Sequence, residues 1–511
     1  MYLSTPLTRR ALIALSACCL SLIPALSSAA TLTVTNTNGD NSAGSLRKAI
    51  EDAGTIGGAD MIIFDADLSG ETIRLDGTEL AVDSDLTIDA SALPDGITIS
   101  GDKTGNGPTV DDSRVFYISG GADVTLISLT ITEGRASDAV FGNDGANGGG
   151  IYILSGTVRL QGCNVVYNST GDGGEYNSDD AGGGGYGGGI YAGGGTLTLE
   201  QCTVAHNRCG DGGSMTGSGS FDYAGAGGNG GGISSSGTLI LRQCTIAHNR
   251  CGDGGSAASG SNAGRGGRGS GISYSGTVTV EQCTITHNRA GDGGDVVSGG
   301  TGGDGGGGGI FAFSGPSTLT DSIVAGNIGG LGGNGGISGD DGNWPDLRDD
   351  SSITTIGINL IGDNTLQSGS PSTVFPAGPF VGTGAAPLDA LLGTLADNGG
   401  PTETLIPLRG SPALNPSGGA AASTFPTDQR GFTRIVAGIM DIGAVEAPDY
   451  AAIDAQIANA ASAKAAQQAD LSRKLKKLKK KAKNAKRKGH KAKAKKYKKQ
   501  IKKMLAQIRA L

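Results

Sequence analysis

Paired aspartates next to the only tryptophan are the first residues of this chain that could do chemistry. They lie in the segment DDGNWPDLRDD, residues 340–350, around Trp344. Two carboxylic acids at a defined separation across a sugar can cleave a glycosidic bond, one of them acting as the general acid. The candidate catalytic residues are Asp340, Asp341, Asp349 and Asp350. The same segment could instead be a structural turn before the last strands, so the sequence assigns no catalytic residue.

Histidines and charged residues recur at fixed places, which raises the question of a metal site. The histidines that precede a recurring asparagine are His206, His248 and His287. Ligands stacked one strand apart form a line, whereas zinc prefers a tetrahedron, so we favour stacked rings over metal binding. The words NRCGDGG and NRAGDGG add arginines and aspartates whose opposite charges neutralise each other. The sequence therefore predicts no metal and no cofactor, with calcium on the aspartate column as the open alternative.

Six cysteines follow residue 30, and they fall into two sets whose members occupy equivalent positions in different repeats. The first set recurs at one place in four repeats and predicts a buried column; its members are Cys163, Cys202, Cys244 and Cys283. Cys209 and Cys251 are a second pair in adjacent repeats. A separation of one strand spacing lies within the range of a disulfide bond, so Cys209–Cys251 is a candidate disulfide. No CxxC occurs, and neither a zinc site nor a thioredoxin-like site is indicated.

The elements that position these residues come from one sequence motif that is repeated five times between Gly148 and Asn327. The copies are GGGIYILSGTVRLQGCNVVYN, GGGIYAGGGTLTLEQCTVAHN, GGGISSSGTLILRQCTIAHN, GSGISYSGTVTVEQCTITHN and GGGIFAFSGPSTLTDSIVAGN. A fixed period of 39 to 42 residues is typical of a solenoid, and apolar residues alternate within each copy as in strands. A unit this thin buries its apolar face only by stacking on the next copy at about 4.8 Å. We therefore predict an all-β protein, a single-stranded right-handed parallel β-helix followed by a basic α-helical tail.

The stacking also predicts a structural ladder of inward-facing amides that bond the copies above and below. Its members are Asn168, Asn207, Asn249, Asn288 and Asn327. Glycine makes up 94 of the 511 residues and gathers between the copies, as in 210–232. Stacked loops leave little room for side chains, so we interpret these stretches as ordered loops rather than as disordered linkers.

Three motifs resemble exported bacterial β-helix proteins. The motif GGGI followed by [VI]xxN is similar to the GGA[IVL] and FxxN repeats of polymorphic outer-membrane proteins. The residues that stand where that family has Phe are Val165, Val204, Ile246, Ile285 and Ile323. The segment 44–50, GSLRKAI, resembles the core of a CSLREA-type entry module. The segments ADNGGPTETLIPLRGSPALNP, TDQRGF and DIGAVE resemble the closing region of choice-of-anchor proteins. The resemblance spans about residues 31–446 and implies this fold and export, but no reaction.

Residues 1–30 predict a secretory signal peptide, because Arg9 and Arg10 precede an apolar run that ends in small residues. The segment TRRAL is similar to a twin-arginine signal, and LSAC is similar to a lipobox, which would place a lipid on Cys18. We expect an exported protein at the cell surface, in the outer envelope or outside the cell, with the periplasm also open.

The tail carries the opposite charge to the body. After residue 450 there are 21 basic and 2 acidic residues, a net +19, whereas the preceding part has 19 basic and 46 acidic residues, a net −27. The composition favours helix. Folding the chain at Gly489-His490 pairs Ala482 with Tyr497, Leu478 with Ile501, Leu475 with Met504 and Leu471 with Ile508. This predicts an antiparallel helical hairpin; a solvated, partly disordered stalk is the alternative.

Lysine clusters bind polyanions with little demand on sequence. The candidate polyanion-binding residues are Lys474, Lys477, Lys480, Lys481, Arg487, Lys488, Lys495 and Lys499. The expected partner is acidic polysaccharide, lipopolysaccharide or another envelope polyanion, not a nucleotide, although the tail could instead fold onto the acidic body. We expect no integral membrane segment, and the oligomeric state stays open.

The sequence thus predicts a signal peptide (1–30), an entry module with the first turns (31–120), a repeat region (121–365), a closing region (366–446) and a lysine-rich helical tail (447–511). The favoured function is a structural or adhesion-type scaffold held to acidic polymers by the tail. A polysaccharide lyase or glycoside hydrolase on the same fold is the alternative.

Overall fold

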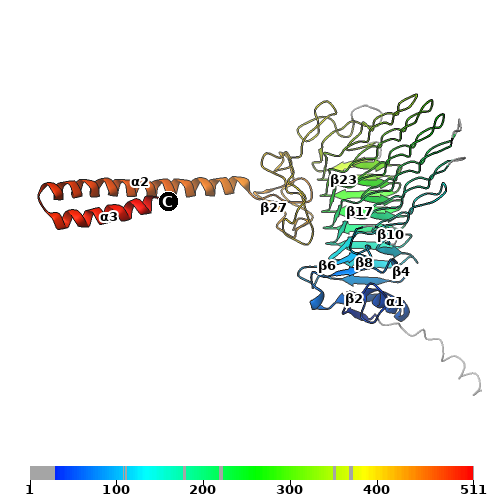
Figure 1. The fold of residues 1–511 in the computed structure, drawn as a ribbon, viewed down its shortest axis with the longest axis horizontal. Helices are drawn as coiled ribbons and strands as arrows, with labels where there is room; N and C mark the ends of the chain where they lie inside the picture. The colour runs from blue at the N-terminus through cyan, green and yellow to red at the C-terminus, as the bar shows by residue number, and fades with distance from the viewer. Residues whose placement is uncertain are drawn as a thin grey trace, which may run out of the picture. The chain divides into compact units, whose positions relative to one another are not determined.

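The computed structural model confirms the parallel β-helix and the helical pair. It describes residues 29–107, 109, 112–176, 180–217, 222–348, 353–366 and 372–509. The chain divides into two compact units, Met1–Glu446 and Ala447–Leu511. In the first unit the strands stack in chain order along the solenoid (Figure 1).

Three parallel sheets form the walls of the solenoid, and every strand pairs with its equivalent in the neighbouring turn. The first sheet has ten strands: β1 (Thr31–Val34), β2 (Asp60–Phe64), β5 (Leu86–Asp89), β8 (Asp123–Ile127), β11 (Thr157–Gln161), β14 (Thr196–Glu200), β17 (Thr238–Arg242), β20 (Thr277–Glu281), β23 (Ser317–Thr320) and β25 (Ile353–Ile356). The second has seven: β4 (Leu80–Val82), β7 (Phe116–Ile118), β10 (Ile151–Ile153), β13 (Ile190–Ala192), β16 (Ile233–Ser235), β19 (Ile272–Tyr274) and β22 (Ile310–Ala312). The third has nine: β3 (Thr72–Arg74), β6 (Ile97–Ser100), β9 (Leu129–Thr132), β12 (Asn164–Val166), β15 (Thr203–Ala205), β18 (Thr245–Ala247), β21 (Thr284–Thr286), β24 (Ile323–Ala325) and β26 (Leu360–Ile361).

The core is a set of columns in which equivalent apolar residues of successive turns lie on top of one another. The isoleucines of the GGGI words are one such column, buried and in register along the second sheet. At the N-terminal end, helix α1 (Leu46–Ile56) buries Leu46, Ala49, Ile50 and Ala53 in the same core. Ser45 caps this helix by accepting the Lys48 N–H at 3.1 Å. A short 3-10 helix, η1 (Ala66–Leu68), follows β2.

One residue of the repeat alignment was assigned wrongly from the sequence. In the fifth copy Val324, not Ile323, pairs with Ile285 and occupies the [VI]xxN position. Neighbouring strand residues face opposite sides of a sheet, so the shift by one residue turns Ile323 to the other face. There it packs with Leu360, Ala390, Ala413 and Ile442 in a second apolar cluster.

The glycine-rich stretches are ordered loops that stack as tightly as the strands. Hydrogen bonds run alternately between the two legs of successive loops, from Gly225 N–H to Gly213 O at 2.9 Å, from Gly255 N–H to Gly225 O at 2.8 Å and from Gly264 N–H to Gly255 O at 2.9 Å. A Cβ added to Gly252 would lie 1.7 Å from the Gly210 carbonyl oxygen. No side chain fits at such a position, which explains the glycine content.

The closing region packs on the third sheet and its edge. Thr203 Oγ1 donates to the Glu403 carbonyl at 2.6 Å, and Gln201 Nε2 donates to the Asp428 carbonyl at 2.9 Å. A two-stranded hairpin, β27 (Ile435–Val436) and β28 (Ile439–Met440), lies within this region. The closing region is therefore part of the first unit.

The second unit is an antiparallel pair of helices, α2 (Tyr450–Arg487) and α3 (Lys491–Arg509), drawn in orange and red in Figure 1. Asp449 caps α2 by accepting the Ala452 N–H at 2.9 Å, and Gly489 makes the turn with φ 76°. The residues predicted for the apolar seam are buried or half-buried, whereas nearly all of their neighbours are exposed. This confirms the helical hairpin.

Candidate functional site

The tryptophan of the aspartate-rich segment belongs to the wall of the solenoid. Trp344 is 7% exposed and packs on Gly307, where an added Cβ would lie 1.3 Å from the indole Nε1. Its carbonyl accepts the Gly308 N–H at 3.0 Å, so this stretch continues the stack of the repeats. The indole is therefore not available for stacking on a sugar ring.

The structure describes two of the four candidate acids of this segment. Asp341 Oδ1 accepts the Gly332 N–H at 2.8 Å and holds a glycine-rich loop, and Asp340 is exposed. Asp349 and Asp350 lie outside the described residues. The segment instead contributes an acid that we did not single out from the sequence, Asp346.

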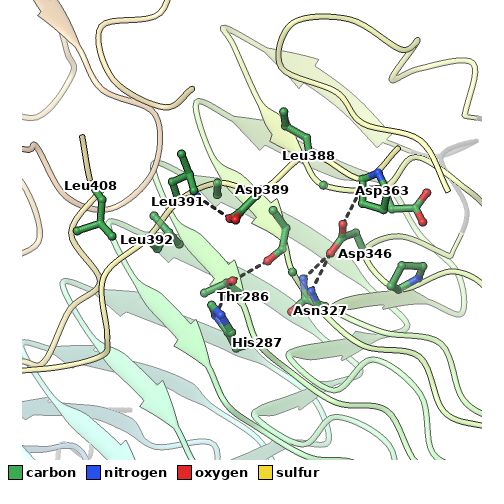
Figure 2. Close-up of a pocket in the computed structure, with 16 residues that line it drawn as sticks. Thr286, His287, Asn327, Asp346, Asp363, Leu388, Asp389, Leu391, Leu392 and Leu408 are labelled. Carbon is green, nitrogen blue, oxygen red and sulfur yellow. Dashed lines mark hydrogen bonds between the residues drawn. The ribbon is translucent and has the colours of Figure 1, made fainter. Parts of the chain in front are cut away.

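Asp346 ends the asparagine ladder (Figure 2). Asn168 donates to Asn207, Asn207 to Asn249, Asn249 to Asn288 and Asn288 to Asn327, each from Nδ2 to Oδ1 at 2.9 to 3.0 Å. Asn327 donates its Nδ2 to Asp346 Oδ1 at 2.8 Å, and the Asp363 N–H donates to Asp346 Oδ2 at 2.7 Å. The last position needs only acceptors, which a carboxylate supplies. Burial raises the pKa of Asp346 to about 7.

The histidines form a column of stacked rings next to this ladder. Ring centroids are 4.8 Å apart from Tyr167 to His206, and 5.0 Å apart in the two following steps to His248 and His287. All four residues have φ between 55° and 57°, the left-handed conformation of a tight turn. Burial, together with the two neighbouring imidazoles, lowers the pKa of His248 to about 4. His248 is therefore uncharged near neutral pH, and burial also lowers the pKa of His206.

A cavity of about 480 Å³ adjoins the last ring of the column (Figure 2). Its wall combines Asn327, Asp346 and Asp363 with a segment of the closing region from Pro387 to Leu392 and with Leu408. Asp389 lies at this wall, where its Oδ1 accepts the Leu391 N–H at 2.8 Å. No local pattern in the sequence indicates this cavity, because its walls come from segments far apart in the chain.

The arginine and aspartate columns pair as expected. Arg208 bonds Asp211 at 2.6 Å, and Arg289 bonds Asp292 at 2.8 Å. The second carboxylate oxygen serves the next turn: Asp211 Oδ1 accepts the Asp253 N–H at 2.7 Å. Within the described residues no group of three or more His, Cys, Asp or Glu side chains is placed to hold a metal ion.

All six cysteines of the described part are buried free thiols. The candidate disulfide between Cys209 and Cys251 is not formed in this structure, in which each thiol donates to a loop carbonyl of its own repeat. Cys209 Sγ donates to Asn229 O at 3.1 Å, and Cys251 Sγ donates to Arg268 O at 3.2 Å. Burial raises the pKa of Cys209 to about 12, so its thiolate is scarce.

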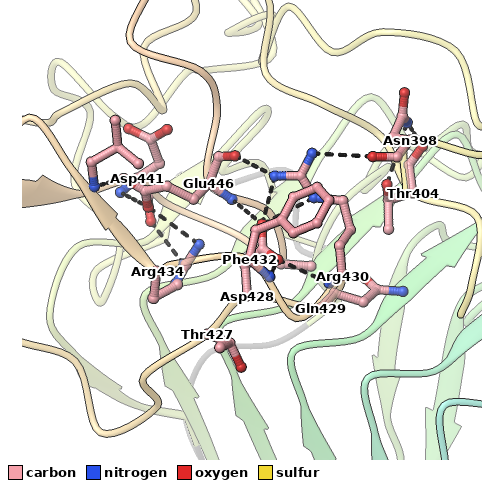
Figure 3. Close-up of polar contacts among 12 residues, drawn as sticks. Asn398, Thr404, Thr427, Asp428, Gln429, Arg430, Phe432, Arg434, Asp441 and Glu446 are labelled. Carbon is pink, nitrogen blue, oxygen red and sulfur yellow. Dashed lines mark hydrogen bonds and ion pairs between the residues drawn. The ribbon is translucent and has the colours of Figure 1, made fainter. Parts of the chain in front are cut away.

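Two motifs of the closing region meet in one buried network (Figure 3). Arg430 donates from Nη2 to Asp428 Oδ2 at 2.7 Å and to the Glu446 carbonyl at 2.6 Å. Arg434 donates to the Asp441 carbonyl at 2.9 Å, and the Asp441 N–H donates to Glu446 Oε2 at 3.1 Å. The motifs TDQRGF and DIGAVE thus hold the closing region together through buried hydrogen bonds, and we assign them no chemistry.

The candidate polyanion-binding residues of the tail are all exposed on the helical hairpin. Lys474 pairs with Asp470 at 2.7 Å, and no other lysine of residues 447–509 forms an ion pair in the structure. Residues 471–509 hold 20 Lys or Arg and no Asp or Glu. The arrangement presents a dense array of cations along two packed helices.

The described features define a class of protein, a parallel β-helix with a docked closing region and a basic helical hairpin. No protein-family model matches this chain, and no curated protein is significantly similar to it. Among the described residues, no helix has the length and apolar composition needed to cross a lipid bilayer. The fold fits a scaffold and also fits an enzyme that acts on polysaccharide.

Proposed function

We propose that this protein is an exported surface or matrix scaffold, held to acidic polymers by its basic helical hairpin. The polymer is acidic polysaccharide or the phosphate-bearing lipopolysaccharide of the envelope. Export rests on residues 1–30, of which 1–28 lie outside the described residues. The solenoid supplies a rigid body with a regular surface.

The contrast between the cations of the two units carries the proposal. Residues 31–450 have 15 arginines against 2 lysines, and the tail has 18 lysines against 3 arginines. Most described body arginines pair with a carboxylate, either in the same turn, as Arg208 does with Asp211 at 2.6 Å, or in neighbouring turns, as Arg242 does with Glu200 at 3.2 Å and Glu281 at 3.7 Å. Arginine suits such fixed pairs, whereas lysine is a hydrated point charge that serves a diffuse polyanion.

The charge density of the hairpin supports a polyanionic partner. Helix α3 has 19 residues and is about 28 Å long at 1.5 Å per residue. The 20 cations of residues 471–509 lie along this length, which gives roughly one positive charge per 1.4 Å. Duplex DNA has a similar density, one negative charge per about 1.7 Å. Such a surface condenses small anions, and their release favours binding of a linear polyanion.

The test uses the full-length protein and asks whether binding depends on the positive charges of the hairpin, with its helical structure kept. One variant replaces the seven candidate lysines by glutamine and Arg487 by glutamine, and its control replaces the same lysines by arginine and keeps Arg487. Both substitutes favour helix, so circular dichroism should show the hairpin retained. Binding to immobilised polygalacturonate, to lipopolysaccharide vesicles and to neutral dextran is measured at rising NaCl concentration.

We expect the glutamine variant to bind both polyanions more weakly and with a shallower salt dependence. The slope of log K against log salt should fall by about 0.7 for each lost contact. The arginine control should bind like the wild type, and dextran should bind none of the proteins. Equal, salt-resistant binding of all three proteins to the polyanions would sink the anchor proposal.

A further inference from the structure

The fifth repeat has no histidine to continue the column of stacked rings. The face of the His287 ring that points toward this repeat is therefore not covered by another ring. The turn after His287 has Gly326 at the equivalent position, because Thr286 pairs with Ala325. His287 is exposed, whereas His206 and His248 are half-buried between their neighbours. The next turn brings Asp363 toward the same column, since Val324 pairs with Ile361. The cavity therefore has a ring face on one side and, on the other, Asp363, whose Oδ1 accepts the Thr365 N–H at 2.8 Å.

The imidazole of His287 is held in a defined orientation. Thr286 has one hydroxyl proton and donates it to the Ala325 carbonyl at 2.6 Å. The contact of 2.9 Å between Thr286 Oγ1 and His287 Nδ1 must then be a hydrogen bond donated by Nδ1–H. The ring is thus fixed before any ligand arrives.

The cavity is negative on its polar side and apolar on the other. Asp346, Asp363 and Asp389 lie in its wall, and none of its lining residues is Lys or Arg. Asp346 is satisfied by three N–H donors, so Asp363 and Asp389 are the acids left to meet a ligand. The apolar wall comes from the leucines Leu388, Leu391, Leu392 and Leu408. A ligand for this site should combine a cation with a short apolar stem.

Elsewhere in this solenoid, arginine side chains lie over the outward-facing rings. Arg114 lies over the stacked rings of Tyr117 and Tyr152, 6.0 and 5.1 Å from their centroids. Arg348 lies 4.4 Å from the centroid of the Phe311 ring. A guanidinium group is planar, so it can stack on a ring while its N–H groups bond carboxylates at its edge.

We propose that this cavity binds the guanidinium group of an arginine side chain presented by a partner protein or peptide. The guanidinium stacks on His287 and pairs with Asp363 and Asp389, and the three methylenes of the side chain lie along the leucines. This site is independent of the tail, so its test does not depend on the polyanion.

Histidine resonances of the full-length protein report on the site directly. The chain has four histidines, so selective ¹³C labelling of the ring gives four signals, and His287→Gln identifies one of them. The probe is a blocked arginine, N-acetyl-arginine N-methylamide. Matched probes are the citrulline analogue, which has the same shape without charge, the lysine analogue and a neutral disaccharide.

Three variants and a control separate binding from folding. Gly326→His should fill the space with a ring, as the three preceding repeats do, and an added Cβ there meets only Thr286 Oγ1 at 3.4 Å. Asp363→Asn and Asp389→Asn remove charge but keep an oxygen for the N–H groups of Thr365 and Leu391. Asp340→Asn removes an exposed acid outside the cavity.

We expect the arginine probe to shift the His287 signal in a saturable way and the three other probes to bind at least about tenfold more weakly, which corresponds to 1.4 kcal/mol. Gly326→His should abolish the shift, each Asp→Asn variant should weaken binding by a similar factor, and Asp340→Asn should bind as the wild type does. An unchanged His287 signal, or equal binding of the citrulline or sugar probe, would overturn the proposal.

Discussion

Replacing the central asparagine of the ladder by aspartate tests how the stack is held together. Asn249 is 1% exposed and donates its Nδ2 to Asn288 Oδ1 and to Val204 O, both at 2.9 Å. Its Oδ1 accepts the N–H and the Nδ2 of Asn207. In Asn249→Asp the accepting side survives, while both donated bonds become contacts between two acceptors.

The expected loss follows from the two acceptors that are left without a donor. A buried polar group without its partner costs about 1–3 kcal/mol, so the variant should lose about 2–6 kcal/mol of unfolding free energy near neutral pH. A protonated carboxyl can donate one bond, which reduces the loss to about 1–3 kcal/mol in acid. The folded-state pKa of the new acid lies above its unfolded value of about 3.9, so the folded state holds the extra proton and the loss grows as pH rises.

Urea unfolding of the wild type and the variant measures the loss of unfolding free energy. The unfolding is followed by far-ultraviolet circular dichroism near pH 3 and near pH 7, which gives the loss in acid and at neutral pH. The matched control is Asn343→Asp, an exposed position, which should change the unfolding free energy by less than about 0.5 kcal/mol. A loss in Asn249→Asp that is as small as in the control, or that does not depend on pH, would refute the reasoning about the ladder.

Three further predictions concern the stack and its thiols. Burial raises the pKa of Asp346 above its unfolded value, so the stability that this group contributes is complete in acid and is lost as pH rises through about 7; Asp346→Asn should flatten this part of the stability profile, and identical pH slopes in both proteins would contradict it. Gly252→Ala places a Cβ 1.7 Å from a carbonyl oxygen and should destabilise the body by about 1–3 kcal/mol, whereas Gly194→Ala, whose Cβ meets its nearest carbonyl oxygen at 3.6 Å, should cost less in thermal unfolding. Alkylation of the unreduced, unfolded mature protein should label Cys209 and Cys251 together with the other four thiols, and a mass that shows only four labels would mean that the candidate disulfide forms.

The repeats made much of the solenoid predictable. Equivalent residues of a parallel β-helix must stack, because each turn pairs with the next in register, so Asn168 and its equivalents had to form a column. The same logic predicted the stacked histidines and the pairing of Arg208 with Asp211. The error in the fifth copy was one of alignment: Val324, not Ile323, stands three residues before Asn327 as [VI]xxN requires, and counting back from Asn327 predicts the correct residue.

The tail was predictable for a different reason. An antiparallel helical pair needs only an apolar residue every three or four positions and a turn, and both can be seen in the sequence around Gly489. Leu475 and Ala485 are buried in this seam, as that spacing requires.

The sequence by itself determined the periodic parts of this protein: the parallel β-helix, its polar and aromatic columns, and the cationic helical hairpin. Only the tertiary structure decided where the non-periodic segments lie. Thr203 meets Glu403, 200 residues further along the chain, and Asp346 joins the ladder from outside the repeat pattern. The cavity beside His287 has walls from the repeats and from the closing region, and no local pattern specifies which segments meet there. A repeat fixes its contacts through a short period, whereas a segment that docks once depends on side-chain complementarity that only the folded chain reveals.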